Sequence, residues 1–198
     1  MALDVEDRRT LLTLARHAIE RGASGRPQAP GESTAFSDAL REKGACFVTL
    51  TINGELRGCI GSLEATRALV LDVEEHAVDA AVNDYRFAPV TPEEVARLHI
   101  ELSVLSAPVP LDYCSGDDLL RKLRPGVDGV ILESGQRRAT FLPQVWEKVP
   151  STVDFLGLLC EKLGTRADAW KRGGLRVSTY RVESFEEEPP GGQQICQA

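Results

Sequence analysis

A two-residue turn signal at Asn53-Gly54 constrains the fold of this chain more than any other feature of the sequence. Both residue types readily adopt the positive φ angles that a type I′ turn requires. Residues 46–52 before the turn and residues 55–62 after it are rich in residues that favour β-strands. The pattern therefore predicts a tight antiparallel hairpin, and with it a sheet built from neighbouring antiparallel strands.

An uninterrupted hairpin with this turn determines which residues of its two strands lie opposite each other. The predicted pairs are Ile52 with Glu55, Leu50 with Arg57, Val48 with Cys59 and Phe47 with Ile60. Because cross-strand partners share a face of the sheet, we expect Arg57 and Cys59 on the face that carries Val48. Cys46 would then lie diagonal to Cys59, roughly 7 Å away and beyond comfortable disulfide geometry.

The rest of the chain is typical of an α+β fold, with a mainly antiparallel sheet and helices packed on it. Helical patterns cover residues 4–21, 36–43, 66–83 and 152–163, a capping box starts a further helix at Thr91, and strand patterns cover residues 99–106, 127–132, 137–142 and 175–185. Hairpins dominate this order, and strands do not alternate regularly with helices. We expect one domain over residues 1–185, with residues 22–33 as a loop within it and residues 186–198 as a disordered tail.

Charge and composition exclude several classes of function. The net charge is −7 and no stretch of the 198 residues forms a basic stripe, which argues against a nucleic-acid partner. An apolar run of about 18 residues and a signal-peptide pattern are both missing, so we expect neither membrane insertion nor secretion. The five scattered cysteines form no Cys-x-x-Cys pair and only three histidines accompany them. We therefore expect reduced thiols in a cytoplasmic protein, with no metal site and no cofactor.

The strand after the turn carries the residues with the most chemical potential. An arginine two positions from a cysteine on one strand face puts a positive charge roughly 7 Å away, which would favour the thiolate of Cys59. Gly58 leaves the backbone beside it open to a ligand. The alternative is structural, because a free cysteine packs well as a small hydrophobe and arginines such as Arg57 often form structural ion pairs. No histidine adjoins Cys59 in the sequence to act as a base.

The helical pattern over residues 66–83 adds two more candidates. One stripe of this helix is apolar and consists of Val70, Val73, Ala77, Ala80 and Ala81. Asp84 follows near the centre of that stripe, and a carboxylate directed at a core requires a partner such as Arg86 or Arg57. Either this pair ties the end of the helix to the sheet, or a polar pocket of Arg57, Cys59, Asp84 and Arg86 binds a ligand. His76 lies at the edge of the stripe, and we expect it to be half-exposed.

Several segments of this chain form a pattern in a fixed order. They are Leu56-Arg57-Gly58-Cys59-Ile60-Gly61, Ala80-Ala81, Asp84 with Arg86-Phe87-Ala88-Pro89, and residues 101–105, 127–130 and 139–146. Taken together, these segments resemble the AMMECR-like family, in the branch called AmmeMemoRadiSam system protein A. The likeness runs from the first helix to about residue 185. The chain departs from the pattern at Tyr85, where many bacterial members have proline, and in the Glu-rich tail with Cys196.

The resemblance implies an α+β fold on an antiparallel sheet and a genetic association with a Memo-like protein and a radical SAM protein, but no particular reaction. One hypothesis is a non-catalytic component that binds a small ligand or a protein partner in that system. The other is a thiol enzyme acting on a small polar or anionic metabolite. In that enzyme Cys59 would be the nucleophile, Arg57 an anion anchor and Asp84 an acid or base. Because no complete catalytic constellation is present, the sequence favours the first.

Overall fold

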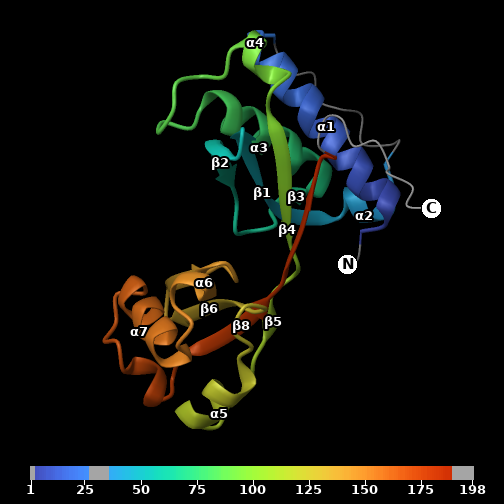
Figure 1. The fold of residues 1–198 in the computed structure, drawn as a ribbon. Helices are drawn as coiled ribbons and strands as arrows, with labels where there is room; N and C mark the ends of the chain where they lie inside the picture. The colour runs from blue at the N-terminus through green and yellow to red at the C-terminus, as the bar shows by residue number, and fades with distance from the viewer. Residues whose placement is uncertain (1–2, 27–35, 189–198) are drawn as a thin grey trace, which may run out of the picture. The chain divides into compact units, whose positions relative to one another are not determined.

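The structure is a computed structural model that describes residues 3–26 and 36–188, and its chain divides into two compact units (Figure 1). Unit 1 consists of the chain up to Leu105 together with the residues from Glu183 onward, and unit 2 is Ser106–Val182. Each unit has its own sheet, and the registers within both sheets are antiparallel. The predicted α+β class is confirmed, whereas the single domain over residues 1–185 stays a prediction, since the chain forms two compact units.

Unit 1 is a sheet whose strand order is β2-β1-β4-β9, with the short β3 paired to the beginning of β1. Its strands are β1 (Lys43–Ile52), β2 (Glu55–Gly61), β3 (Arg67–Ala68), β4 (His99–Leu105) and β9 (Val182–Glu186), and its helices are α1 (Val5–Ala23), α2 (Asp38–Arg41), α3 (Leu69–Val82) and α4 (Pro92–Val95). Helix α3 packs on the sheet, and α1 packs on α3. All five residues of the predicted stripe on α3 are buried in this core.

Helix α1 begins where its cap was predicted and runs slightly further. The Asp4 side chain accepts a hydrogen bond from the N–H of Asp7 at 2.7 Å, and the Asp7 side chain accepts one from the N–H of Asp4 at 3.3 Å. This reciprocal pair satisfies donors that the first turn of a helix leaves free. The helix ends at Ala23, so the predicted loop starts two residues later than expected, and its residues 27–33 lie outside the described part of the chain.

The hairpin forms at the predicted turn, but its register shifts after the first two pairs. Asn53 and Gly54 have φ angles of 54° and 82°, and Ile52 lies opposite Glu55 as expected. A bulge between Leu50 and Thr51 then adds one residue to β2. The observed pairs are Thr51 with Leu56, Leu50 with Gly58, Thr49 with Cys59, Val48 with Ile60 and Phe47 with Gly61. The predicted pairings of Leu50 with Arg57, of Val48 with Cys59 and of Phe47 with Ile60 are therefore wrong.

The close approach of α3 explains why the register shifts. A Cβ atom on Gly58 would lie 2.1 Å from the carbonyl oxygen of Ala80, so only glycine fits opposite Leu50 on this face. In the uninterrupted register Arg57 would occupy that position and its side chain would collide with the helix. The bulge moves Arg57 out of the ladder and places Cys59 with Thr49, on the face away from α3. Cys46 lies on the buried face, and both cysteines are free thiols.

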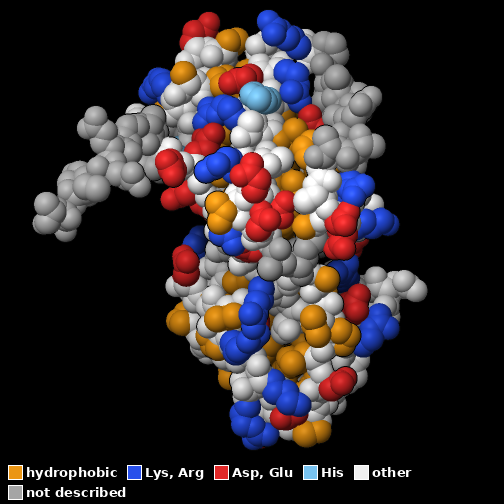
Figure 2. Space-filling view, turned by 90° about the vertical axis from the view of Figure 1, so that its right-hand side faces the viewer, with side chains coloured by type: hydrophobic (Ala, Val, Ile, Leu, Met, Phe, Trp, Pro, Cys, Tyr) orange, Lys and Arg blue, Asp and Glu red, His pale blue; other side chains and the backbone are white. Residues whose placement is uncertain are grey.

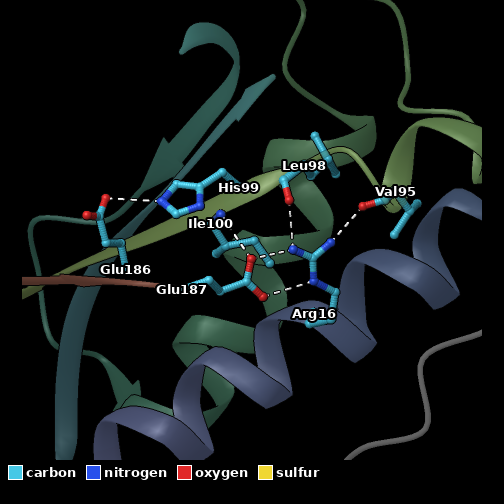
Figure 3. Close-up of polar contacts among 7 residues, drawn as sticks. All are labelled: Arg16, Val95, Leu98, His99, Ile100, Glu186 and Glu187. Atoms are coloured by element: carbon cyan, nitrogen blue, oxygen red, sulfur yellow. Dashed lines mark hydrogen bonds and ion pairs between the residues drawn. The ribbon is translucent and has the colours of Figure 1, made fainter. Parts of the chain in front are cut away.

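Arg16 of α1 joins three segments of unit 1 that are distant in the sequence (Figure 3). Its guanidinium donates to the carbonyl oxygens of Val95 at 2.6 Å and Leu98 at 2.8 Å, and it forms a two-pronged ion pair with Glu187. Glu187 in turn exchanges hydrogen bonds with the backbone of Ile100 on β4. The first helix, the entry to β4 and the end of β9 are thus held by a single side chain.

Unit 2 is a second antiparallel sheet, with strand order β5-β8-β6-β7, and its own core. Its elements are β5 (Val109–Pro110), α5 (Gly116–Lys122), β6 (Gly129–Ser134), β7 (Arg137–Phe141), α6 (Val145–Lys148), α7 (Thr152–Lys162), the 3₁₀ helix η2 (Ala169–Lys171) and β8 (Arg176–Tyr180). The rings of Trp146 and Phe155 stack with centroids 3.6 Å apart, and the Trp146 indole N–H donates to the carbonyl of Asp128 at 2.7 Å. The stack fixes α6 and α7 to each other.

The last predicted strand, residues 175–185, is in fact two strands in two different sheets. β8 belongs to the sheet of unit 2 and β9 to that of unit 1. They separate at Arg181, whose N–H donates to the hydroxyl of Ser106 and whose carbonyl accepts from the N–H of Ser106. Of the tail that was predicted to be disordered, Glu186 ends β9 and Glu187 is bound by Arg16, while residues 189–198 lie outside the described residues.

The surface carries both signs of charge. On the face shown in Figure 2, basic and acidic side chains are intermixed, and hydrophobic side chains lie among them. Among residues 3–26 and 36–188, no helix is both long enough and apolar enough to cross a membrane.

The contact of Gly58 with α3 makes a prediction about stability. Gly58→Ala places a methyl group against the Ala80 carbonyl and should lower the free energy of unfolding by about 1–3 kcal/mol. Gly157→Ala in α7 is the matched control, since its Cβ would meet neighbours only at 3.7 Å and beyond. That substitution should be neutral or stabilise by up to about 1 kcal/mol. Urea denaturation followed by circular dichroism measures both, and equal effects of the two variants would contradict the packing argument.

Candidate functional site

Strand β2 is an edge of its sheet, and the backbone of Cys59 faces outward there. Edge strands present N–H and C=O groups that no neighbouring strand satisfies. At Cys59 the N–H donates to the Asp84 carboxylate at 2.9 Å, and the C=O accepts from the Arg86 guanidinium at 3.0 Å. The Asp84-Tyr85-Arg86 segment therefore caps the sheet edge in place of another strand.

The two charged residues of this cap are also bound to each other. Arg86 Nε lies 2.9 Å from Asp84 Oδ1 and Arg86 Nη2 lies 2.6 Å from Oδ2, while the backbone N–H of Arg86 donates to Oδ1 at 3.2 Å. The hydrogen bond from the Arg86 side chain, with the N–H groups of Cys59 and Arg86, outweighs burial and holds the pKa of Asp84 well below its usual range. A carboxyl group held ionised in this way is poorly matched to acid–base work near neutral pH.

Arg57 binds Glu94 and not Asp84, its predicted partner in a shared pocket. Its Nε and Nη2 atoms lie 3.1 and 3.0 Å from the two carboxylate oxygens of Glu94 on α4. It also donates to the carbonyl oxygens of Ala88 at 2.8 Å and Pro89 at 3.3 Å. The hydrogen bond from Arg57 lowers the pKa of Glu94 to about 2, so this pair is ionised at neutral pH. Arg57 thus fastens the loop between α3 and α4 to the bulge in β2.

Cys59 itself lies half-buried on the face of the sheet away from α3. Its Sγ atom is 3.4 Å from the hydroxyl oxygen of Thr49, its partner across the hairpin. The side chain of Arg57 is directed at Glu94 and at the loop carbonyls, so the predicted arrangement of Arg57 beside the thiol on one face does not form. Of the four residues proposed as a pocket, Asp84 and Arg86 meet Cys59 through its backbone, and Arg57 belongs to a separate ion pair.

The space beside Gly58, which the sequence suggested for a ligand, is occupied by the protein. Gly58 is buried, and the carbonyl of Ala80 on α3 lies where its side chain would be. The absence of a side chain there serves the packing of a helix on a strand. Gly58 has no open surface with which to contact a ligand.

A buried carboxylate, Asp72 on α3, was missed by the sequence interpretation. It accepts a hydrogen bond from the N–H of Cys46 at 2.9 Å, is reached by the Ser62 hydroxyl at 3.2 Å, and lies 3.4 Å from Nε2 of His76. Burial acts to raise its pKa, but the interactions with His76 and Cys46 outweigh this and lower it. His76 is buried, so the expectation of a half-exposed histidine is wrong. The i, i+4 spacing of Asp72 and His76 was the signal available in the sequence.

Two features of the described residues limit what this region can do chemically. In the described part of the chain there is no group of three or more His, Cys, Asp or Glu side chains arranged to hold a metal ion. The carboxylates of Asp72 and Asp84 bind backbone N–H groups, and Arg57 and Arg86 neutralise carboxylates. What the region presents to solvent is Tyr85, which is 94% exposed between the two fixed residues of the cap.

The cap predicts how stability depends on pH. The pKa of Asp84 is lower in the folded chain than in the unfolded one, where it is about 3.9, so its contribution is complete above about pH 4 and is lost as the pH falls further. Asp84→Asn should cost about 2 kcal/mol at neutral pH and should flatten the loss of stability below about pH 4. Asp117 is an exposed residue of α5, so Asp117→Asn should change neither the stability at neutral pH nor its loss at low pH. Urea denaturation over a pH series measures this, and parallel curves for wild type and Asp84→Asn would contradict it.

Comparison with known proteins agrees with this fold over nearly the whole chain. The AMMECR1 family model matches residues 12–185. A protein of Thermofilum pendens is 37% identical, covering 98% of this chain and 95% of its own length, and one of Thermococcus gammatolerans is 38% identical, covering 92% and 91%. The crystal structure of an uncharacterized protein from Pyrococcus horikoshii is similar with a TM-score of 0.73 at 36% identity, and it covers 93% of both chains. The chain therefore belongs to the AMMECR1 family, as its hairpin motif, Leu56-Arg57-Gly58-Cys59-Ile60-Gly61, and the segments that follow it predicted.

Proposed function

We propose that this protein is a non-catalytic binding component that works in the cytoplasm with a Memo-like protein and a radical SAM protein. The observation that supports this best is that Arg57, Asp84 and Arg86 are all engaged in interactions within the fold. Arg57 binds Glu94, Asp84 binds Arg86, and both pairs also bind backbone groups. An active site of this composition would require at least one such group directed at open space. The cytoplasmic location is supported by the free state of the described cysteines.

Tyr85 is the residue that we propose contacts a protein partner. Its neighbours Asp84 and Arg86 are fixed to the edge of β2, and the N–H of Phe87 donates to the carbonyl of Asp84 at 3.0 Å. The ring is therefore presented on a turn that loses little conformational entropy on binding. Tyrosine is enriched among the residues that dominate binding energy at interfaces. Leu56, three residues before Cys59, is 44% exposed and adds apolar surface to the same strand.

Co-purification tests this proposal. The tagged chain, co-expressed with the Memo-like and radical SAM proteins of the same genome, should retain at least one of them. Tyr85→Ala should weaken retention about tenfold or more, and Tyr85→Phe, which keeps the ring, should preserve most of it. Val153→Ala, an exposed apolar residue of α7, is the control for loss of apolar surface elsewhere. Failure of the wild-type chain to retain either protein, together with turnover by the isolated chain, would end the proposal.

The alternative function, a thiol enzyme acting on a small polar or anionic metabolite through Cys59, rests on one observation. Cys59 is half-buried and hydrogen-bonded to the hydroxyl of Thr49, whereas Cys46 and Cys160 are buried. Iodoacetamide labelling of the native protein compares Cys59 with Cys114, an exposed thiol in the same molecule. If the protein is a binding component, Cys59 should label no faster than Cys114 at any pH. The Cys59→Ala variant should then still retain the protein partners on co-purification. Labelling of Cys59 that is faster by about tenfold near neutral pH, with loss of function in Cys59→Ala, would favour the enzyme instead.

A further inference from the structure

Unit 2 contains a groove of about 700 Å³ that has no part in the hairpin motif. One wall is the segment from Pro110 to Ser115, which leads from β5 to α5. The other is the segment from Lys171 to Ser178, which leads from η2 into β8. The groove is within the size range of sites for small molecules, which is about 300–1,000 Å³.

The groove opens where β5 separates from its neighbour. β5 pairs with β8 at Ser178 and Thr179, and the N–H of Leu111 still reaches the carbonyl of Val177 at 2.8 Å. Two residues later the hydroxyl of Tyr113 donates to the carbonyl of Leu175 at 2.9 Å. The Tyr113 side chain bonds here where a backbone N–H would bond in a paired strand. Because this side chain is long, it holds the segment of Tyr113 apart from the segment of Leu175. Burial raises the pKa of Tyr113, so its hydroxyl keeps the proton that it donates.

Basic side chains gather along the second wall. Lys171, Arg172 and Arg176 all line the groove, whereas the acidic residues in its lining are Asp112 and Glu133. Arg172 lies 2.9 Å from Asp168, and Arg176 lies 3.4 Å from Glu133. Both arginines are largely exposed, and exposed pairs of this kind contribute little to stability, so their guanidinium groups remain available to an incoming anion. The carboxylates serve to orient them.

The backbone between these basic residues is open as well. Gly173 and Gly174 have φ angles of 76° and 85°, and a Cβ atom on either would meet nothing within 4 Å. Glycine is required here by the left-handed conformation and not by close packing. The turn therefore exposes bare backbone between Arg172 and Arg176, where a ligand can approach closely.

We propose that this groove binds a small organic anion, with its carboxylate or phosphate group at Lys171, Arg172 and Arg176 and its apolar part against Leu111 and Tyr113. Guanidinium groups match the geometry of carboxylate and phosphate oxygens. A basic cluster of three side chains, in a chain of net charge −7, suits a small anion and not a polyanion such as nucleic acid. This site identifies the class of ligand for the proposed binding function. Its biological role rests on that function, but the binding of an anion in the groove does not.

Nuclear magnetic resonance of the full ¹⁵N-labelled chain tests the site, with phenyl phosphate and benzoate as probes. Each probe should shift the amide signals of residues 111–115 and 171–178 saturably, and inorganic phosphate should bind about tenfold more weakly because it lacks the ring. The double variant Lys171→Gln/Arg176→Gln should weaken binding of both probes by about tenfold or more. Arg9→Gln/Lys148→Gln removes the same charge from exposed positions outside the groove and should leave binding unchanged. The spectra also report whether each variant is folded.

Cys114 provides an independent readout, because it lines the groove and is exposed. Phenyl phosphate should slow the labelling of Cys114 by N-ethylmaleimide, measured by mass spectrometry, while Cys59 in the same molecule labels at an unchanged rate. Absence of saturable shifts in these two segments at about 10 mM probe, or equal weakening by both double variants, would overturn the site. A chain that retains its protein partners but binds neither probe would refute the groove and leave the proposed function intact.

Discussion

Two carboxylates hold α3 to its sheet, and the arrangement of the hairpin motif depends on them. Asp72 in the first turn of the helix binds the N–H of Cys46, and Asp84, just beyond the last turn, binds the N–H of Cys59. Cys46 lies where β1 passes from its pairing with β3 to its pairing with β2, and Cys59 faces the edge of the sheet. Both N–H groups would otherwise lack a partner in the ladder, and an unsatisfied buried donor is costly. The apolar stripe of α3 supplies non-directional burial, whereas the two carboxylates determine where along the strands the helix lies.

The attachment of α3 to the sheet by Asp72 and Asp84 explains the roles of Arg57, Gly58 and Cys59 in the hairpin motif. Gly58 lets α3 approach the strand, and Arg57, displaced from the ladder by the bulge, binds the loop that leads from α3 to α4. Cys59 contributes its backbone to Asp84 and Arg86. Gly58 and Arg57 therefore have structural tasks that depend on their residue types, whereas Cys59 acts through its backbone. Its consequence for function is indirect, because a rigid edge presents Tyr85 to solvent.

Local patterns predicted the parts of this fold that local interactions determine. The Asn53-Gly54 turn, the cap of α1 at Asp4 and the apolar stripe of α3 follow from backbone preferences and helical periodicity, and all three are observed. The register of β2 was predicted wrongly because it depends on the carbonyl of Ala80, which no pattern within the hairpin contains. Residues 175–185 form one continuous β-rich stretch with no glycine or proline, so nothing local marks the change of sheet at Arg181.

The candidate site was predictable to a similar extent and for the same reason. The pairing of Asp84 with Arg86 follows from the cost of burying a lone carboxylate close to an arginine, and it is observed. The partner of Arg57 lies 37 residues away on α4, and only the folded chain shows that Glu94 and not Asp84 binds it. Asp72 was missed because its apolar neighbours Val70 and Val73 made the segment look like ordinary core. A polar residue at a core position is itself a signal when an i, i+4 partner such as His76 is present.

The order of the chain adds a constraint on how unit 1 is completed. Unit 2 is inserted between β4 and β9, and its ends meet where Ser106 and Arg181 bond to each other. Strand β9 and Glu187 are therefore added to unit 1 only after the whole of unit 2 has been synthesised. The bond from Arg16 to Glu187 spans 171 residues, and contacts of such separation form late because a long loop must close first. The helix at one end of the chain and the strand at the other are thus joined in one unit, while the inserted unit carries a separate core and groove.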